Sequence, residues 1–93
     1  MMKICGINYS VLYKTSDEME GRIGLANFNT QEIWIGNSFS EQTQKIALWH
    51  ETLHIISDAY NLKMNEEQIT FTTHALIAFV EDNPSIKTFF EVK

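Results

Sequence analysis

The alternation of apolar and polar positions divides the chain into a β-rich first part and a helical second part. Up to about residue 36, apolar residues tend to alternate with polar ones, which is typical of half-buried strands. Four strands are predicted, over residues 2–5, 8–13, 22–28 and 31–36. We expect them to form two hairpins, taken in chain order.

The predicted connections carry residues that favour turns. Gly6-Ile7 is expected to turn the first hairpin, with glycine first, as a type II′ turn requires. Asn29-Thr30 is expected to turn the second, because asparagine tolerates a left-handed conformation. Residues 15–21, between the hairpins, are polar and acidic and are expected to form a loop.

Residues 41–60 have the periodicity of an amphipathic helix. Apolar side chains recur there at steps of three and four and predict one buried stripe: Ile46, Trp49, Leu53, Ile56 and Tyr60. Leu48 and Ile55 lie outside this stripe, so more than one side of the helix should be covered. The helix is therefore expected to lie between two other layers of the protein.

Capping residues mark the starts of two helices. Ser38 or Ser40 is expected to cap the first helix, and Ser38 with Glu41 matches a capping box. Asn65 is expected to cap the second helix, with Gln68 at the third helical position. Both signals use side-chain oxygens to accept hydrogen bonds from the first N–H groups of a helix.

The second helix has its own predicted buried stripe, formed by Ile69, Thr73, Leu76, Phe79 and Val80. It should end at Asp82-Asn83-Pro84, because the residue before proline avoids the helical region. The tail, residues 85–93, contains Ile86, Phe89 and Phe90 and is expected to dock on the body of the protein.

These elements predict a single domain over residues 1–93, with an α+β fold. Residues 1–37 would form a small antiparallel β-sheet of two hairpins, and residues 38–84 two main α-helices packed on it. Residues 85–93 would be the C-terminal tail. A chain of 93 residues with 44% hydrophobic and 20% charged residues can bury one modest core.

Charge and cysteine content narrow the expected surroundings. A net charge of -5 supplies no basic face for phosphates, so no nucleic-acid partner is expected. Cys5 is the single cysteine, which fits a reducing compartment. The N-terminal stretch has no long apolar run, so we expect no signal peptide, no membrane partner and a cytoplasmic location.

The chemically informative stretch is His50-Glu51-Thr52-Leu53-His54, which reads H-E-x-x-H. Histidines four apart on a helix lie about 6 Å apart along its axis and roughly 40° apart around it. Both imidazoles can therefore reach one metal ion, with the intervening carboxylate beside it. The motif predicts His50 and His54 as Zn²⁺ ligands and Glu51 as the catalytic base.

A catalytic zinc site needs a third protein ligand and one open position. Asp58, one turn past His54, is better placed to orient that histidine. His74 lies away from the apolar stripe of its helix and is expected at the surface. Glu66 lies near the margin of that stripe, whereas Glu67 points away from it, so Glu66 is the predicted ligand and Glu67 the alternative.

The sequence resembles a known family at these positions. An H-E-x-x-H helix followed by Glu66-Glu67 at the start of the next helix is similar to the gluzincin pattern. GLANF (24–28) and EIWI (32–35) resemble the strand pair ahead of the active helix in minimal phage-type, ImmA/IrrE-like metallopeptidases. NEEQI (65–69) and FVEDNP (79–84) resemble the ends of the second helix in the small phage versions. Only H-E-x-x-H is chemically specific among these motifs.

The resemblance implies a minimal zincin-like zinc metallopeptidase that cleaves a protein or peptide, such as a repressor. His50 and His54 would match the histidine ligands, Glu51 the catalytic glutamate, and Glu66 or Glu67 the third ligand. The strand around Ile33–Gly36 would be the cleft edge against which a peptide lies. The spacing from the histidines to the glutamates is much shorter than in the large gluzincins, which leaves the choice of glutamate open.

Two other functions are compatible with the sequence. The chain could be a non-catalytic zinc-binding regulatory or interaction domain derived from a phage or mobile element, which its small size favours. It could also be a small helical binding module in which the motif is accidental. The sequence indicates neither the substrate nor the oligomeric state.

Overall fold

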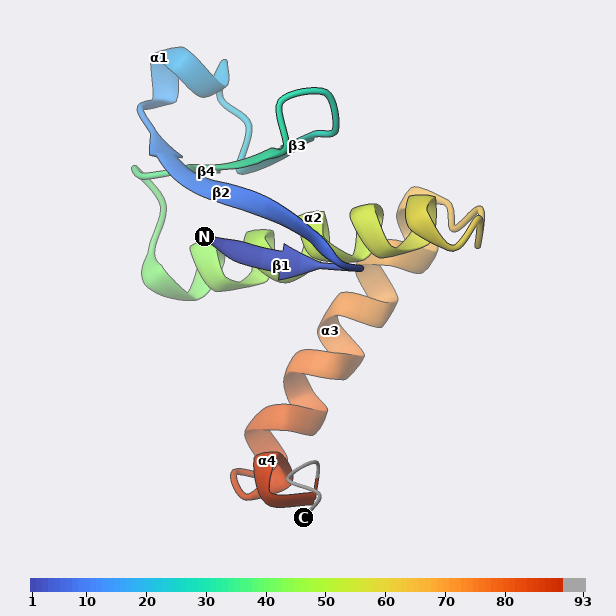
Figure 1. Cartoon of the computed structure of the whole chain (residues 1–93). Coiled ribbons are helices and arrows are strands. Elements are labelled where there is room, and N and C mark those ends of the chain that lie inside the picture. Colours follow the sequence, from blue (N-terminus) through green and yellow to red (C-terminus); the bar gives the residue numbers. More distant parts are fainter. Residues whose placement is uncertain (90–93) are drawn as a thin grey trace.

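The computed structural model describes residues 1–89, apart from the side chains of Lys87 and Phe89. Its elements follow one another as β1 (Met2–Ile4), β2 (Ile7–Lys14), α1 (Ser16–Met19), β3 (Gly24–Asn27), β4 (Glu32–Gly36), α2 (Glu41–Ala59), α3 (Glu66–Asp82) and α4 (Ile86–Phe89). The sheet lies on one side of α2, and α3 extends away from the other side (Figure 1). The predicted α+β fold, with a sheet packed on two main helices, is confirmed.

The sheet has four strands in the order β1-β2-β4-β3. Within each hairpin the strands are antiparallel, but β2 and β4 pair in parallel, with Ser10 opposite Glu32 and Lys14 opposite Gly36. The sheet is therefore mixed, whereas the sequence had suggested a wholly antiparallel sheet. The chain crosses over from β2 through α1 and β3, so that β4 returns in the direction of β2.

The first hairpin turns one residue earlier than predicted. Ile4 pairs with Ile7, so Cys5 and Gly6 are the two turn residues. Both have positive φ, 51° and 82°, which is the geometry of a type I′ turn rather than type II′. Gly6 is therefore the second turn residue rather than the first, and Cys5 is the first.

The second hairpin turns around the predicted Asn29-Thr30, but the turn covers residues 28–31 and its left-handed residue is Gln31, with φ of 57°, rather than Asn29. The Asn27 side chain accepts hydrogen bonds from the backbone N–H groups of Asn29, at 3.0 Å, and Thr30, at 3.1 Å. An asparagine that bonds the backbone two and three residues ahead holds such a turn without help from the rest of the protein.

The predicted loop over residues 15–21 contains a short helix, α1. Thr15 and Glu18 form a reciprocal capping box, and Glu20 ends the helix in a left-handed conformation. The T-x-x-E signal was present in the sequence and was not used. Met19 is only 3% exposed, so this helix also anchors the crossover to the body.

Helix α2 starts at the second of the two candidate caps. The Ser40 hydroxyl accepts from the backbone N–H of Thr43 at 3.2 Å, whereas the predicted capping box of Ser38 with Glu41 is not formed, because the helix begins after Ser40. Ser40 therefore satisfies one of the N–H groups that the first helical turn leaves without a partner.

Two sides of α2 are covered, as the off-stripe residues had suggested. The side facing the sheet contributes Ala47 and Ile55 to the main core, which also contains Ile4, Tyr9, Ile33 and Ile35. Leu53 is buried outside that cluster. Of the predicted stripe only Leu53 is buried, whereas Ile46, Trp49 and Ile56 are partly exposed. Tyr60, at the end of that stripe, is the C-cap of α2 and is 65% exposed.

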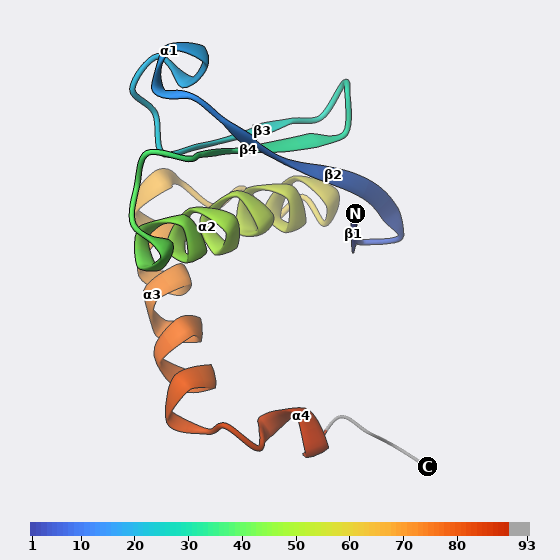
Figure 2. The same ribbon diagram turned by 90° about the vertical axis from the view of Figure 1, so that its left-hand side faces the viewer.

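Helix α3 has the predicted capping box of Asn65 and Gln68 and the predicted end before Asn83 and Pro84. Its buried residues are Ile69, Thr73 and Ile77. Phe79 and Val80, predicted to be buried, are 48% and 37% exposed. Within residues 1–89, the second half of α3 extends away from the sheet (Figures 1 and 2), and only the side of the helix that carries Ile77 is buried there.

The short helix α4 lies at the far end of α3, away from the sheet (Figure 2). The predicted docking of the tail on the body is therefore wrong for residues 86–89, and residues 90–93, with Phe90, lie outside the described residues.

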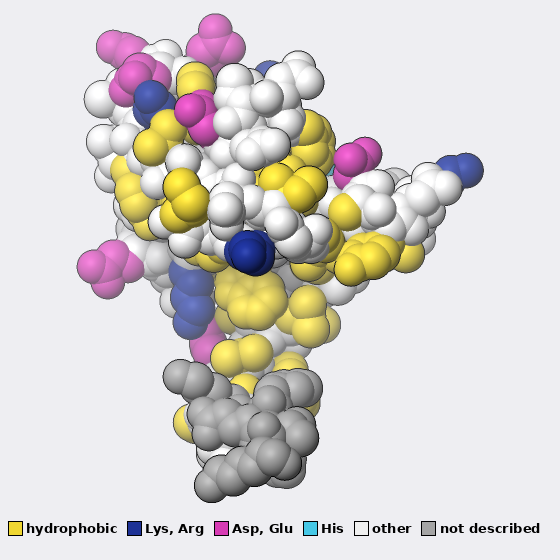
Figure 3. Space-filling model, in the orientation of Figure 1, with side chains coloured by type: hydrophobic (Ala, Val, Ile, Leu, Met, Phe, Trp, Pro, Cys, Tyr) yellow, Lys and Arg dark blue, Asp and Glu magenta, His cyan; other side chains and the backbone are white. Residues whose placement is uncertain are grey.

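Apolar side chains gather beneath the sheet, where α3 leaves the body (Figure 3). Among residues 1–89, none of the helices is both long enough and apolar enough to cross a membrane.

The capping assignment can be tested by replacing each serine. Ser40→Ala should lower the free energy of unfolding by about 1 kcal/mol, because the N–H of Thr43 loses its acceptor. Ser38→Ala is the matched control and should leave stability within about 0.5 kcal/mol of wild type. Urea unfolding followed by circular dichroism measures both, and a larger loss for Ser38→Ala would contradict the assignment.

Candidate metal centre

His50 and His54 lie one turn apart on α2 and form a ring pair. Their ring centroids are 4.9 Å apart and the ring planes are inclined by 64°. Their side chains are 19% and 32% exposed, so each is partly covered. The helix thus presents two nitrogen donors from one side, as the spacing of the motif requires.

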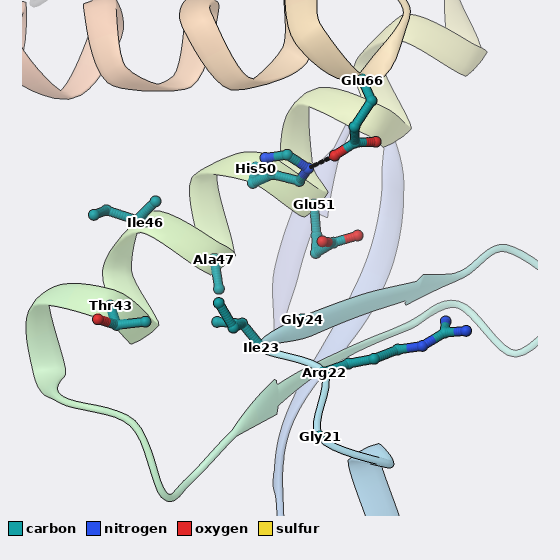
Figure 4. A pocket seen from close by; sticks show the side chains of 10 residues that line it. All are labelled: Gly21, Arg22, Ile23, Gly24, Thr43, Ile46, Ala47, His50, Glu51 and Glu66. Carbon is teal, nitrogen blue, oxygen red and sulfur yellow. Dashed lines mark hydrogen bonds and ion pairs between the residues drawn. The ribbon is translucent and has the colours of Figure 1, made fainter.

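Glu66, the first residue of α3, meets both histidines. Its Oε1 lies 2.5 Å from His50 Nε2, and its Oε2 lies 3.1 Å from His54 Nε2. Figure 4 shows the contact with His50 and the origin of the two side chains in different helices. One carboxylate therefore bridges the two imidazoles that the sequence pattern had paired.

The turn between α2 and α3 brings Glu66 into place. Asn61 adopts a left-handed conformation with φ of 54°. The N–H of Leu62 donates to the carbonyl of Ser57 at 2.8 Å, and the N–H of Asn61 to that of Asp58 at 3.2 Å. This pair of bonds is a Schellman motif, which ends a helix and reverses the chain.

The side chain of Ser57 adds a further tie that the sequence analysis missed. Its hydroxyl accepts from the backbone N–H of Met64 at 3.0 Å, and the residue is 6% exposed. The large majority of buried hydroxyls are hydrogen-bonded, because a buried polar group without a partner is costly. The one available signal was a serine that directly follows the apolar pair Ile55-Ile56 near the end of α2.

The other candidate ligands lie outside this cluster. His50, His54 and Glu66 are the one group of three or more potential ligands found within residues 1–89. Glu67 and His74 are exposed residues of α3, and Asp58 is exposed near the end of α2. The structure thus brings Glu66 to the histidines and leaves its alternative, Glu67, apart from them.

The geometry and chemistry of the three donors fit a zinc ion. Two ligand atoms of a tetrahedral zinc lie about 2.0–2.2 Å from the metal and so about 3.3 Å from each other. The donor atoms here lie within 4.8 Å of one another. The distance of 2.5 Å between His50 Nε2 and Glu66 Oε1 is shorter than the distance between two ligand atoms of one zinc ion. The Glu66 side chain is 68% exposed, so it has room to move outward. Two imidazoles and a carboxylate are a common set for catalytic zinc, and they leave a fourth position open.

Glu51 faces the sheet rather than α3. It lies against Gly24 at the start of β3, where an added Cβ would be 3.1 Å from both Cγ and Oε2 of Glu51. Burial raises the pKa of the Glu51 carboxyl. The interaction with His54 opposes that rise, the nearby Glu66 carboxyl adds to it, and the N–H of Ala26 and the guanidinium of Arg22 oppose it more weakly. A carboxylate with a raised pKa is a stronger proton acceptor.

The strand beside Glu51 is β3, which is one of the two edge strands of the sheet, the other being β1. The sequence had placed the cleft edge at the strand around Ile33–Gly36, but that strand, β4, is paired on both sides, with β2 and β3. The expectation is wrong because the strand order follows from the parallel β2–β4 pair, which no local pattern reveals.

A cavity of about 460 Å³ adjoins the cluster. It lies between residues 21–24 and the first turns of α2, and His50, Glu51 and Glu66 border it (Figure 4). Catalytic groups beside a concave, mostly apolar space are the usual arrangement of a small-molecule or peptide site.

Comparison with protein-family models, with curated proteins and with solved structures found no match for this chain. The resemblance to minimal metallopeptidases therefore stays a prediction, and the assignment of the site depends on the residues of this chain.

The raised pKa of Glu51 predicts a specific pH dependence in metal-free protein. Because the folded-state pKa lies above the ordinary value of 4.5, the folded state holds this proton more tightly than the unfolded chain does. The contribution of the Glu51 carboxyl to stability is fully present at pH values below its ordinary pKa. It is lost as the pH rises through the raised pKa of the folded state. In excess chelator, the free energy of unfolding of wild type should therefore fall relative to that of Glu51→Gln as the pH rises from the ordinary pKa to the raised one. Urea midpoints from pH 4 to pH 8 measure this, and a difference that moves the other way would contradict it.

Proposed function

We propose that this protein is a zinc-dependent metallopeptidase that hydrolyses a peptide bond in a protein substrate. The observation that supports the proposal best is the convergence of His50, His54 and Glu66 from two helices, with Glu51 on the adjoining face of α2. Two imidazoles, a carboxylate ligand and a separate partly buried carboxylate are the groups that metal-assisted hydrolysis needs.

His50, His54 and Glu66 would hold the ion. Bound there, zinc would supply Lewis acidity to the attacking water and to the carbonyl of the cleaved bond. Glu51 accepts one proton from the water as the water oxygen forms a bond to the carbonyl carbon. Glu51 then delivers that proton to the amide nitrogen as the carbon–nitrogen bond breaks, which returns the carboxylate to its starting state.

Strand β3 offers an edge on which an extended peptide can be held. The carbonyl of Ile23 accepts from the N–H of Gly36 at 2.8 Å, so the main chain of Ile23 points toward β4. In an antiparallel pair the direction alternates along the strand, which turns the main-chain groups of Gly24 and Ala26 toward the free edge, where the Ala26 N–H also meets Glu51. A peptide paired there would pass beside Glu51.

A non-catalytic zinc-binding regulatory or interaction domain is the second candidate. It is favoured by the composition of the cavity wall, where, among the residues that the structure describes, Arg22 and Thr43 are the side-chain donors besides His50 that could face a developing oxyanion. Such a non-catalytic domain would bind zinc through the same three ligands and would show no cleavage of any peptide. An accidental motif would instead show no zinc binding.

Zinc binding is expected to depend on the histidines of the motif. Purified protein should bind one equivalent of zinc, and His54→Ala should weaken that affinity by at least about 100-fold, because a direct ligand is lost and even outer partners are worth 10–100-fold. His74→Ala is the matched control, since that histidine is exposed and lies outside the cluster. Calorimetric titration with zinc measures both, and equal affinities for the two variants would contradict the assignment.

Cleavage is expected to depend on Glu51. Glu51→Gln should reduce kcat by about 10²–10⁴-fold, because the amide cannot accept the proton of the water. Zinc affinity should stay near that of wild type, since Glu51 is outside the ligand group. Turnover of a random peptide mixture, followed by mass spectrometry, measures the loss. Undiminished turnover in a fully zinc-loaded variant would rule out the role of Glu51.

A further inference from the structure

Helix α3 has a second line of residues on the side turned away from its buried face. The buried residues of the helix, Ile69, Thr73 and Ile77, follow one line along it. At about 100° per residue, five exposed residues at steps of four, four, three and four form the opposite line: Glu67, Phe71, Ala75, Ala78 and Asp82. These five residues are the outer stripe of α3.

The middle of the outer stripe is apolar and exposed. Phe71 is 66% exposed, and Phe79, which borders the stripe, is 48% exposed. From Gln68 to Val80 the helix carries no acidic or basic side chain except His74. A helix with apolar residues on all sides is typical of one that is covered on all sides, and aromatic residues are enriched at protein interfaces. The composition of α3 therefore indicates that a further layer covers the outer stripe.

The position of α3 leaves this stripe open to another molecule. The helix extends away from the sheet, and α4 lies at its far end (Figures 1 and 2). The Cα radius of gyration is 14.0 Å, against about 12 Å for a compact domain of this length. From Glu67 to Asp82 the stripe is about 22 Å long, at 1.5 Å per residue. This is the length of a contact between two helices packed side by side.

The charges at the ends of the stripe select its occupant. Glu67 and Asp82 flank the apolar middle, and α3 contains no lysine or arginine. The other two acids of the helix contact side chains of α2, Glu66 at the histidines and Glu81 at Lys45. An occupant with a basic residue at each end of an apolar stripe would therefore meet an opposite charge at both ends.

The same charges disfavour two other occupants. If the outer stripes of two copies of this chain packed side by side, acid would meet acid at both ends, whether the helices ran parallel or antiparallel, and like charges in contact are repulsive. The anionic surface of a membrane attracts basic segments and would repel Glu67 and Asp82. A basic helix from another protein is thus the occupant that matches both the apolar middle and the acidic ends.

We propose that the outer stripe of α3 binds an amphipathic helix of a partner protein, whose apolar stripe carries a lysine or arginine at each end. Phe71 packs among the apolar side chains of the partner, and Ala75 and Ala78 let the two helices approach closely. Glu67 and Asp82 pair with the two basic residues and so set the register. The inference goes beyond the proposed peptidase function and does not depend on zinc, because no residue of the stripe belongs to the ligand group.

The experiment uses two synthetic helical peptides of about 18 residues, long enough to span the stripe. The lysine peptide has leucines at steps of three and four, a lysine at each end of this leucine stripe and uncharged polar residues elsewhere. The glutamate peptide has glutamate in place of both lysines. Fluorescence anisotropy of each labelled peptide measures its affinity for the protein, with zinc and in excess chelator. The lysine peptide should bind at least about tenfold more tightly than the glutamate peptide, and zinc should change neither affinity.

A variant of the apolar middle tests where the peptide binds. Phe71→Ala should weaken binding of the lysine peptide by at least about tenfold, because a central aromatic anchor is lost. Phe71 is exposed, so its loss should leave the circular dichroism spectrum unchanged. Tyr13→Ala is the matched control, because Tyr13 is a 58% exposed aromatic residue on β2. It should keep the affinity of wild type.

A charge reversal tests the acidic ends. The double variant Glu67→Lys with Asp82→Lys should reverse the preference, so that the glutamate peptide binds more tightly than the lysine peptide. The double variant Asp17→Lys with Glu20→Lys is the matched control. It changes the net charge by the same amount at exposed positions of α1 and its C-cap, and it should keep the preference for lysine.

Each contrary result overturns the proposal. Equal binding of the two peptides, a loss that Tyr13→Ala shares with Phe71→Ala, or a lysine preference that survives the double reversal at Glu67 and Asp82 contradicts it. Sedimentation should show a monomer, and vesicles containing phosphatidylserine should not bind the protein. A dimer that Phe71→Ala dissociates would assign the stripe to a second copy, and vesicle binding lost in Phe71→Ala would assign it to a membrane. Failure of zinc binding or of cleavage overturns the proposed peptidase and leaves this surface in place.

Discussion

The reversal of the chain between α2 and α3 is the constraint on which the candidate centre depends. H-E-x-x-H places two imidazoles on one helix by its spacing alone, but a third donor must come from elsewhere. The Schellman motif at Asn61 and the bond from Met64 to the Ser57 hydroxyl define how the chain turns back. Asn65 then starts α3, so Glu66 is its first residue and stands over the histidines.

Helix α2 separates the two chemical tasks because two layers cover it. His50 and His54 face the start of α3, where Glu66 meets them, whereas Glu51 faces β3 and lies against Gly24. The sheet therefore governs the environment of Glu51, the proposed base, and the helix pair governs the three proposed ligands. This division explains why burial raises the pKa of Glu51 while Glu66 remains largely exposed.

The features that the sequence predicted correctly are local ones. The cap at Asn65 and the helix end before Pro84 each depend on a few neighbouring residues, and both are confirmed. The helical angle singled out Glu66, and the structure places that residue at the histidines. The short helix after Thr15 was also encoded locally, by a T-x-x-E pattern that was not used.

The features that escaped prediction depend on what packs against what. The parallel pairing of β2 with β4 makes β3 an edge strand, and no local pattern specifies that order. Tyr60 and Phe79 fit the apolar stripes of their helices, but they lie beyond the layers that could bury them. The role of Gly24 likewise appears only once β3 is seen to approach Glu51.

Zinc K-edge X-ray absorption on the zinc-loaded protein tests the convergence of the three donors most directly. The account predicts two imidazole nitrogens and one or more oxygens at about 2.0–2.2 Å, with one imidazole lost in His50→Ala and the spectrum unchanged in His74→Ala. A shell of oxygens alone, or a spectrum that His50→Ala leaves unaltered, would contradict it.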